Sequence, residues 1–262
     1  MTTRTQILAI ANQKGGVAKT TTVASLGAAL VERGSRVLIV DLDPQACLTF
    51  SLGVDPEDVE LSLHHVLTKG VDAAEVILET EDGVDLLPAT IDLARAEADL
   101  LTRTGREHVV KTALEGLAER EDGKAAYDWI LLDCPPSLGV LTVAALTAAH
   151  AVLIPLQCET LSHRGVGQLL DTVHDVRRFT NKELQVWGVL PTLYDGRTLH
   201  ARAVLDTIAE AYDLDVLGPP IPKTIRFAEA PAAGRSILST HRRHRGAEAY
   251  REVAAHLAEK VR

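Results

Sequence analysis

Two lysines flank a pair of glycines near the start of the chain, in the segment NQKGGVAKTT at residues 12–21. The segment follows a short apolar run at residues 7–11 and precedes a helical pattern that begins at Lys19. A glycine-rich turn between a strand and a helix lets backbone N–H groups approach phosphate oxygens, and the helix N-terminus adds a favourable dipole. In such a loop Lys19 would neutralise phosphate charge and the Thr20 hydroxyl would bind Mg²⁺. The turn therefore predicts a nucleotide phosphate site, whereas a glycine-rich turn with surface lysines is the alternative.

The general phosphate-loop pattern GxxxxGK[ST] does not fit this segment, because Ala18 stands directly before the second lysine. The segment matches the variant xKGGxxK[ST], and in this form it resembles the ParA/MinD class of P-loop ATPases. The resemblance implies ATP and Mg²⁺ as cofactors and catalytic roles for both lysines. Lys14 is then expected to contact the phosphates bound by the partner subunit of an ATP-sandwiching homodimer. The residues that this resemblance places against the nucleotide are Lys14, Gly15, Gly16, Val17, Ala18, Lys19, Thr20 and Thr21. The family usually has glycine where Ala18 stands, so we expect its methyl group to affect turnover more than nucleotide binding.

Two aspartates follow apolar runs later in the chain. Asp43 stands in RVLIVDLDPQ, and a carboxylate at the carboxyl end of a parallel strand points into the crevice where ligands bind. The family's DxDPQ motif implies that Asp43 orients the attacking water and helps to organise the metal site, while a structural cap is the alternative that suits Asp41. Asp133 stands in YDWILLDCPPS, which resembles a Walker B strand whose carboxylate holds the Mg²⁺ hydration shell.

The segment IPKTIRFAEAP, at residues 221–231, resembles the family's IPRNVRxxEAP loop. In the family a proline and an asparagine border the adenine, and these positions correspond to Pro222 and Thr224. Threonine offers one hydroxyl group and lacks the paired donor and acceptor of an amide. The resemblance therefore predicts an adenine-facing loop whose selectivity for the base is weaker than its phosphate site.

The apolar runs and helical patterns alternate along the chain. Runs rich in Val, Ile and Leu predict strands at residues 7–11, 37–41, 84–88, 129–133, 151–155, 186–191 and 215–217. Helical patterns lie at residues 19–33, 91–103, 107–120, 139–149, 162–179, 199–212 and 245–261. This alternation predicts the α/β class, with a single doubly wound, mostly parallel sheet and helices on both faces. We expect residues 1–262 to form one P-loop ATPase domain.

Composition and charge limit the kinds of molecule that this chain is expected to bind. The chain has 262 residues, 46% of them apolar, and we see neither a signal peptide nor an apolar stretch of the roughly 20 residues that cross a bilayer. Its three cysteines lack metal-type spacing and are expected to be reduced thiols. The net charge of −9 is uneven, because residues 223–262 carry nine basic and four acidic side chains, or +5, which leaves −14 for the rest. A basic end on an acidic body keeps a polyanionic partner possible.

The resemblance implies two alternative binding partners. ParA-like ATPases bind DNA without sequence preference, whereas MinD-like ones bind membrane through a C-terminal amphipathic helix. The last 15 residues have only Val253, Leu257 and Val261 as larger aliphatic side chains, so we expect this helix to pack on the sheet and no membrane to be bound. The family's DNA-contacting arginines correspond to Arg197 and Arg226. Further phosphate contacts are expected from Arg242, Arg243 and Arg245, and all would be sequence-neutral and salt-dependent.

The resemblance extends from about residue 6 to about residue 257. It implies a cytoplasmic, nucleoid-associated ATPase that forms an ATP-dependent dimer and drives DNA segregation, with slow hydrolysis stimulated by a ParB-like partner. A MinD-like membrane regulator and an orphan ParA relative that positions another cargo remain as alternatives. A metabolic ATP-dependent amidoligase is disfavoured, because no pocket for a second substrate is evident in the sequence. The segment TLSHRG, at residues 160–165, departs from the aromatic-ALEG pattern of many partitioning proteins and indicates a different contact there.

Overall fold

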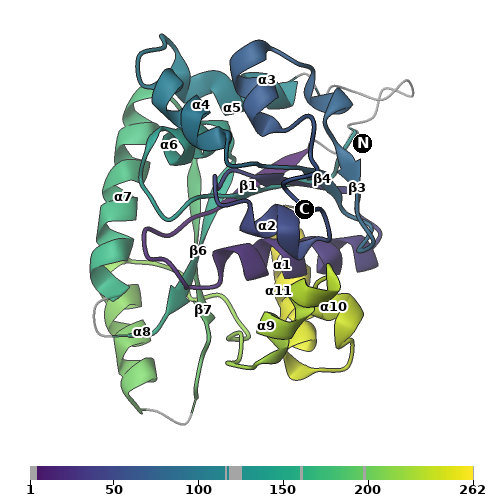
Figure 1. Ribbon diagram of the computed structural model, residues 1–262. Coiled ribbons are helices and arrows are strands. Elements are labelled where there is room, and N and C mark those ends of the chain that lie inside the picture. The colour runs from purple at the N-terminus through teal and green to yellow at the C-terminus, as the bar shows by residue number, and fades with distance from the viewer. Residues whose placement is uncertain (1–4, 116, 118–125, 160–161, 197–198, 262) are drawn as a thin grey trace.

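A computed structural model describes residues 5–115, 117, 126–159, 162–196 and 199–261 of the chain (Figure 1). Within these residues one sheet has seven strands in the order β3-β4-β2-β5-β1-β6-β7. All neighbouring strands are parallel except β3 and β4, which are antiparallel. The strands are β1 (Gln6–Ile10), β2 (Val37–Asp41), β3 (Leu78–Glu79), β4 (Asp85–Leu87), β5 (Trp129–Asp133), β6 (Ala151–Gln157) and β7 (Gln185–Thr192).

Continuous apolar runs form the central strands because both faces of a parallel sheet are covered by helices. Every residue of β2 and β5 is buried. The strand predicted at residues 215–217 was wrong, since Val216 makes only an isolated bridge to Val189 and is 43% exposed. The short edge strand β3 was not predicted, because both of its residues are exposed and carry no apolar pattern.

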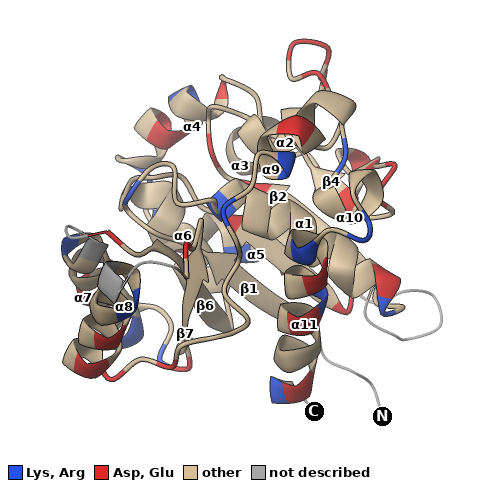
Figure 2. Cartoon of the chain, turned by 90° about the horizontal axis from the view of Figure 1, so that it is seen from below, with Lys and Arg blue, Asp and Glu red and all other residues tan. Residues whose placement is uncertain are grey.

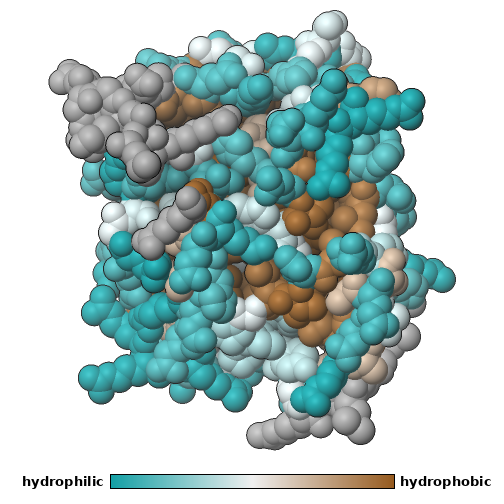
Figure 3. Space-filling model, turned by 180° about the vertical axis from the view of Figure 1, so that it is seen from behind, coloured by the Kyte–Doolittle hydropathy of each residue, from teal (hydrophilic) through white to brown (hydrophobic). Residues whose placement is uncertain are grey.

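Helices cover both faces of the sheet, which confirms the predicted doubly wound α/β class (Figure 1). One face packs against α3 (Leu63–Lys69), α4 (Leu93–Leu100), α5 (Val109–Glu115), α6 (Val140–Ala148), α7 (Ser162–Phe179) and α8 (Leu199–Tyr212). The other core includes side chains of α1 (Lys19–Glu32), α2 (Cys47–Ser51), α9 (Arg226–Glu229), α10 (Ile237–Thr240) and α11 (Arg245–Lys260). The part of the chain that the structure describes also has three 3₁₀ turns: η1 (Ala73–Glu75), η2 (Arg106–His108) and η3 (Ala230–Ala233). Hydrophilic side chains cover most of the surface seen from behind, around an apolar area (Figure 3).

The C-terminal helix α11 packs against α1 (Figure 1). Val253 and Leu257 are buried in the same core cluster as residues of β1, so the predicted packing of this helix onto the sheet is confirmed, with α1 as a direct neighbour. The hydroxyl groups of Tyr250 and Thr22 are 2.9 Å apart in the buried interface. In the described part of the chain no helix is both long and apolar enough to cross a membrane.

Candidate nucleotide site

The loop between β1 and α1 is held by contacts with distant parts of the sheet. Asn12 is buried; its amide donates a hydrogen bond to the Pro155 carbonyl at 2.7 Å and its side-chain oxygen accepts one from Lys14 N at 2.9 Å. On the opposite side of the loop, the Thr192 hydroxyl donates to the Val17 carbonyl at 2.9 Å. Sequence reasoning missed both anchoring residues, although each one lies at or just beyond the carboxyl end of a strand, where ligands of such sheets bind.

The backbone of the loop is shaped for close approach to a ligand. Gly16 has φ 73°, and Ala18, which precedes α1, has φ 62° and ψ 35°. A Cβ atom built on Gly15 or Gly16 would meet nothing within 4 Å, so open space lies beside both glycines. Thr20 and Thr21 follow in the first turn of α1 and are partly buried. Exposed loop N–H groups at a helix N-terminus are typical of a phosphate site.

Lys19 lies at the bottom of this site. Its side chain is buried, and its ammonium donates to the Lys14 carbonyl at 3.3 Å. Burial lowers the pKa of Lys19, while the nearby carboxylates of Asp133 and Asp43 raise it. A desolvated cation beside an open glycine loop is suited to an anionic ligand.

Three aspartates lie at or just beyond the carboxyl ends of two adjacent strands, and the charges of two of them, Asp133 and Asp43, act on Lys19. Asp41 and Asp133 are register partners on β2 and β5, and Asp43 follows two residues later. Asp41 accepts hydrogen bonds from Thr49 N at 2.9 Å, from the Thr49 hydroxyl at 2.7 Å and from Asp43 N at 3.1 Å, while burial raises its pKa to about 6. These contacts make Asp41 a structural cap. Asp43 is half-buried and accepts a hydrogen bond from Gln45 N at 2.9 Å.

Asp133 differs from Asp41 because neither of its buried carboxyl oxygens has a hydrogen-bond partner. Burial and the neighbouring Asp41 raise the pKa of Asp133 well above its usual value; the Thr20 hydroxyl opposes this rise, although its geometry falls short of a hydrogen bond. Two unsatisfied oxygens beside a threonine hydroxyl fit Mg²⁺, which prefers oxygen ligands and keeps several waters at phosphate sites. The described residues contain no cluster of three or more His, Cys, Asp or Glu side chains that would bind a metal without a nucleotide.

The Lys14 side chain reaches Glu159, two residues beyond the end of β6. Its ammonium lies 2.5 Å from a carboxylate oxygen of Glu159, and the two side chains are 34% and 53% exposed. The structure therefore gives the two lysines different surroundings, one inside the site and one at its rim.

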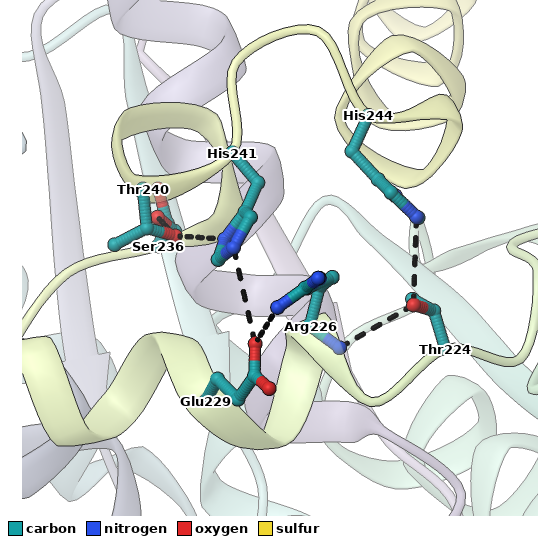
Figure 4. Close-up of polar contacts among 7 residues, drawn as sticks. All are labelled: Thr224, Arg226, Glu229, Ser236, Thr240, His241 and His244. Atoms are coloured by element: carbon teal, nitrogen blue, oxygen red, sulfur yellow. Dashed lines mark hydrogen bonds and ion pairs between the residues drawn. The ribbon is translucent and has the colours of Figure 1, made fainter.

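The loop expected to border the adenine connects α8 to α9. Pro222 bridges to Tyr194, and the Thr224 hydroxyl accepts a hydrogen bond from Arg226 N at 3.3 Å and lies 3.5 Å from His244 Nε2 (Figure 4). His244 in turn caps α11, because its Nδ1 accepts a hydrogen bond from Gly246 N at 3.0 Å. Burial and then the charge of Arg245 lower the pKa of His244, which favours this neutral form.

The arginines expected to contact DNA fall into three groups. Arg197 lies outside the described residues. Arg226 forms an ion pair with Glu229 at 2.6 Å. Arg242, Arg243 and Arg245 are exposed just before and at the start of α11, and among the described residues no carboxylate lies within ion-pair distance of them. Lys and Arg segments lie around α9, α10 and α11 in the view from below (Figure 2).

A groove of about 1090 Å³, whose lining includes Pro44, the residue after Asp43, was not predicted. It is lined by α2, by the segment that follows α2 and by residues 90–92. Its lining contains the carboxylates of Asp55, Glu57, Glu60 and Asp92 but neither Lys nor Arg. An anionic ligand would therefore be repelled from this groove.

Comparison with known proteins agrees with this geometry. The family model AAA_31, described as an AAA domain, matches residues 5–186. The chain is 43% identical over 254 residues to the sporulation initiation inhibitor protein Soj of Bacillus subtilis, covering 97% of this chain and 98% of that protein. It is 38% identical over 258 residues to the chromosome partitioning protein ParA of Caulobacter vibrioides, covering 98% of this chain and 95% of that protein.

A solved structure from Mycobacterium smegmatis is also similar. It is described as cobyrinic acid a,c-diamide synthase with bound ADP and magnesium, and it shares 55% identity with a TM-score of 0.85 over 97% of this chain and 94% of that chain. Soj and ParA match nearly the whole length of this chain, and the structure has a buried lysine and two aspartates at the carboxyl ends of parallel strands. This chain therefore belongs to the ParA/Soj family of P-loop ATPases.

Proposed function

We propose that this protein is a DNA-partitioning ATPase that dimerises around ATP, binds DNA without sequence preference and leaves DNA after hydrolysis. The observation that carries this proposal is the buried Lys19 beside an open glycine loop, together with the nearby Asp133 carboxylate, whose two oxygens have no hydrogen-bond partner. Such a site stabilises bound phosphate charge through a desolvated cation and fixed backbone dipoles.

Each residue of the site has a separate task in this proposal. Lys19 and the N–H groups of residues 15–21 bind the phosphates, while Thr20 and Asp133, with Asp43 nearby, would hold Mg²⁺. When bound, Mg²⁺ supplies positive charge that neutralises the phosphate oxygens. Asp43 orients water for in-line attack, because its carboxylate is half-buried at the mouth of the site. Pro222 and Thr224 border the base.

Lys14 would serve the second subunit. Its ammonium is exposed at the rim and is held by Glu159 in the single chain, so it can exchange this partner for phosphates presented by another protomer. An exposed ion pair of this kind costs little to break, typically about 0.2–1 kcal/mol. ATP would therefore favour the dimer by offering Lys14 a more highly charged partner.

DNA fits the exposed surface better than a membrane does. The larger aliphatic side chains of α11, Val253 and Leu257, are buried, whereas Arg242, Arg243 and Arg245 are exposed beside it. Dimerisation would double this basic surface and allow bivalent contact with DNA in spite of the net charge of −9. A ParB-like partner would stimulate hydrolysis and thereby release the dimer from the nucleoid.

DNA retention in four nucleotide states tests the proposal: no nucleotide, ADP, ATP and a non-hydrolysable ATP analogue, each at two salt concentrations. We expect retention only with ATP or the analogue, and a steep loss at higher salt. Lys19→Ala should lose both nucleotide binding and retention, whereas Asp43→Ala should bind ATP, hydrolyse it slowly and stay on DNA. Equal retention in all four states would contradict the nucleotide switch, and wild-type turnover by Asp43→Ala would remove that residue from hydrolysis.

A second candidate function is favoured by the 55% identity to the Mycobacterium smegmatis structure, whose description names a diamide synthase that acts on an acid. Such an enzyme would need a site for a carboxylic acid beside the ATP phosphates. The groove beside Asp43 is lined by four carboxylates without Lys or Arg, which disfavours an anionic substrate there. ATP consumption that depends on cobyrinic acid and a nitrogen donor, with no dependence on DNA, would support the synthase over the partitioning function.

A further inference from the structure

Arg226 already has an anionic partner within the chain. Its guanidinium Nη1 lies 2.6 Å from Glu229 Oε2, three residues later on α9 (Figure 4). The two side chains are 44% and 45% exposed, so both groups remain accessible to water and to a ligand. A carboxylate and a phosphate offer similar oxygen acceptors to a guanidinium, and therefore compete for the same donor groups.

The pair is held on a fixed element of the structure. Phe227, between the two charged residues, is 8% exposed and packs edge-to-face on the Tyr250 ring of α11, with ring centroids 5.8 Å apart. Glu229 N donates a hydrogen bond to the Ile225 carbonyl at 3.1 Å. Because this packing fixes the backbone of α9, Glu229 stays within reach of Arg226.

Glu229 also lies within the most basic part of the chain. The same carboxylate oxygen is 3.8 Å from His241 Nε2, and His241 Nδ1 is 3.1 Å from the Thr240 hydroxyl (Figure 4). Arg242, Arg243 and Arg245 follow directly in sequence after His241. Glu229 therefore places one negative charge at the edge of a surface that the proposed function assigns to a polyanion.

We infer that Glu229 is a built-in competitor of the DNA backbone, which occupies Arg226 and limits the affinity of the basic surface for phosphate. This inference rests on the proposed function and names a residue that sets its strength. DNA binding requires Arg226 to exchange Glu229 for a phosphate, and the displaced carboxylate repels that phosphate at short range. The competition lowers the DNA affinity of a single protomer, whereas a dimer with two basic surfaces still binds DNA through bivalent contact.

The test compares Glu229→Gln with Glu252→Gln, measuring ATP-dependent DNA affinity over a range of salt concentrations. Both variants gain one unit of positive net charge, but Glu252 is exposed on α11 and forms no ion pair within the described residues, so it controls for overall charge. We expect Glu229→Gln to tighten DNA binding up to about fivefold per protomer, or about 25-fold for the dimer. The slope of log affinity against log salt should change by less than about 0.9 per protomer, because Arg226 neutralises one phosphate in both proteins once DNA is bound.

A double-mutant cycle with Arg226→Gln separates this mechanism from a general charge effect. If Glu229 acts by occupying Arg226, then in the Arg226→Gln background Glu229→Gln should tighten DNA binding no more than Glu252→Gln does. An equal gain in both backgrounds, or an equal gain from the two glutamate variants, overturns the inference and leaves the proposed function intact. Absence of ATP-dependent DNA retention in the wild type and in every variant overturns both.

Discussion

Ala18 adopts a backbone conformation that glycine accepts more easily than alanine. Its φ of 62° and ψ of 35° lie in the left-handed region, immediately before the first residue of α1. For an L-residue with a Cβ atom this conformation costs about 1–2 kcal/mol. Alanine recovers part of this cost because it restricts the unfolded chain more than glycine does. The usual glycine of the family at this position is therefore explained by backbone geometry.

Ala18→Gly should leave the free energy of unfolding unchanged or raise it by up to about 1 kcal/mol, because relief of the left-handed strain offsets the entropy that glycine adds to the unfolded chain. Urea denaturation without nucleotide measures the change. Ala255→Gly, inside α11, is the matched control and should lower the free energy of unfolding by about 1 kcal/mol. Equal destabilisation by the two variants would contradict strain at Ala18.

The buried Asp133 carboxyl makes stability depend on pH when nucleotide and metal are absent. Burial raises its folded-state pKa above the unfolded value, so the folded chain retains a proton that the unfolded chain releases as pH rises above about 4. The contribution of Asp133 to the free energy of unfolding therefore decreases as pH rises from the unfolded-state pKa to the folded-state pKa. Asp41, whose pKa is raised to about 6, also lowers the free energy of unfolding as pH rises.

Asp133→Asn removes this ionisable group and should raise the free energy of unfolding relative to the wild type by more at pH 8 than at pH 5.5. The gain grows with pH because the unfolded wild-type chain releases a proton that the folded chain retains, whereas the variant has no such group. The measurement is urea denaturation in the presence of EDTA. Asp206→Asn, at an exposed position of α8, is the control and should show no comparable pH-dependent gain. A pH-independent effect of Asp133→Asn would contradict a raised pKa.

Among the elements, α1 links the phosphate loop to the C-terminal helix. Tyr250 of α11 is fully buried, and its hydroxyl lies 2.9 Å from that of Thr22 in the first turn of α1. At the other end of α1, Arg251 contacts Glu32 with Nε–Oε2 and Nη2–Oε1 distances of 2.5 and 3.0 Å. These contacts hold the helix that starts at the nucleotide loop against the helix that starts at the basic cluster.

Tyr250→Phe should lower the free energy of unfolding by about 1–2 kcal/mol, because a buried hydrogen bond is lost and the Thr22 hydroxyl loses a partner. The matched control is Tyr212→Phe, which removes an exposed hydrogen bond to the His163 carbonyl and should cost less than about 0.5 kcal/mol. Chemical denaturation of both variants measures the difference. Equal losses would show that the interface between α1 and α11 does not depend on this contact.

At the scale of the whole molecule, we propose that the chain acts as one unit. One sheet includes strands from residue 6 to residue 192, and α11 closes onto α1 at the other end of the sequence. The proposed phosphate and metal residues lie at or just after the carboxyl ends of β1, β2 and β5, while Lys14 is at the rim, where a second chain would approach. Dimerisation is therefore the step expected to connect nucleotide binding to DNA binding.

Lys14→Ala should still bind ATP, because Lys19 and the loop N–H groups remain in place. It should lose ATP-dependent dimerisation and, as a result, DNA retention. Nucleotide titration and light scattering on the same sample separate the two properties. Lys182→Ala, at an exposed position between α7 and β7, is the control and should retain both. An intact ATP-dependent dimer without Lys14 would contradict its proposed role in the partner's site.

Much of the fold and of the candidate site was predictable from local sequence. The apolar runs before Asn12, Asp43 and Cys134 mark buried strands, and polar residues at their ends lie at one edge of the sheet because parallel strands share their direction. Exposed or short elements such as β3, α2 and α3 were missed, since few residues give too weak a periodic pattern. Residues 215–217 had the composition of a strand but form only an isolated bridge, from Val216 to Val189 of β7, and Val216 is exposed.

Sequence alone determined the class of fold, the glycine loop and the aspartates, because these depend on periodicity and on residues close together in the chain. Only the tertiary structure showed that Asn12 bonds to Pro155 and Thr192 to Val17, over sequence separations of 143 and 175 residues. It also placed Lys14 against Glu159 and left both oxygens of Asp133 without a partner. Such contacts depend on how distant segments pack together, and packing is decided by the whole chain.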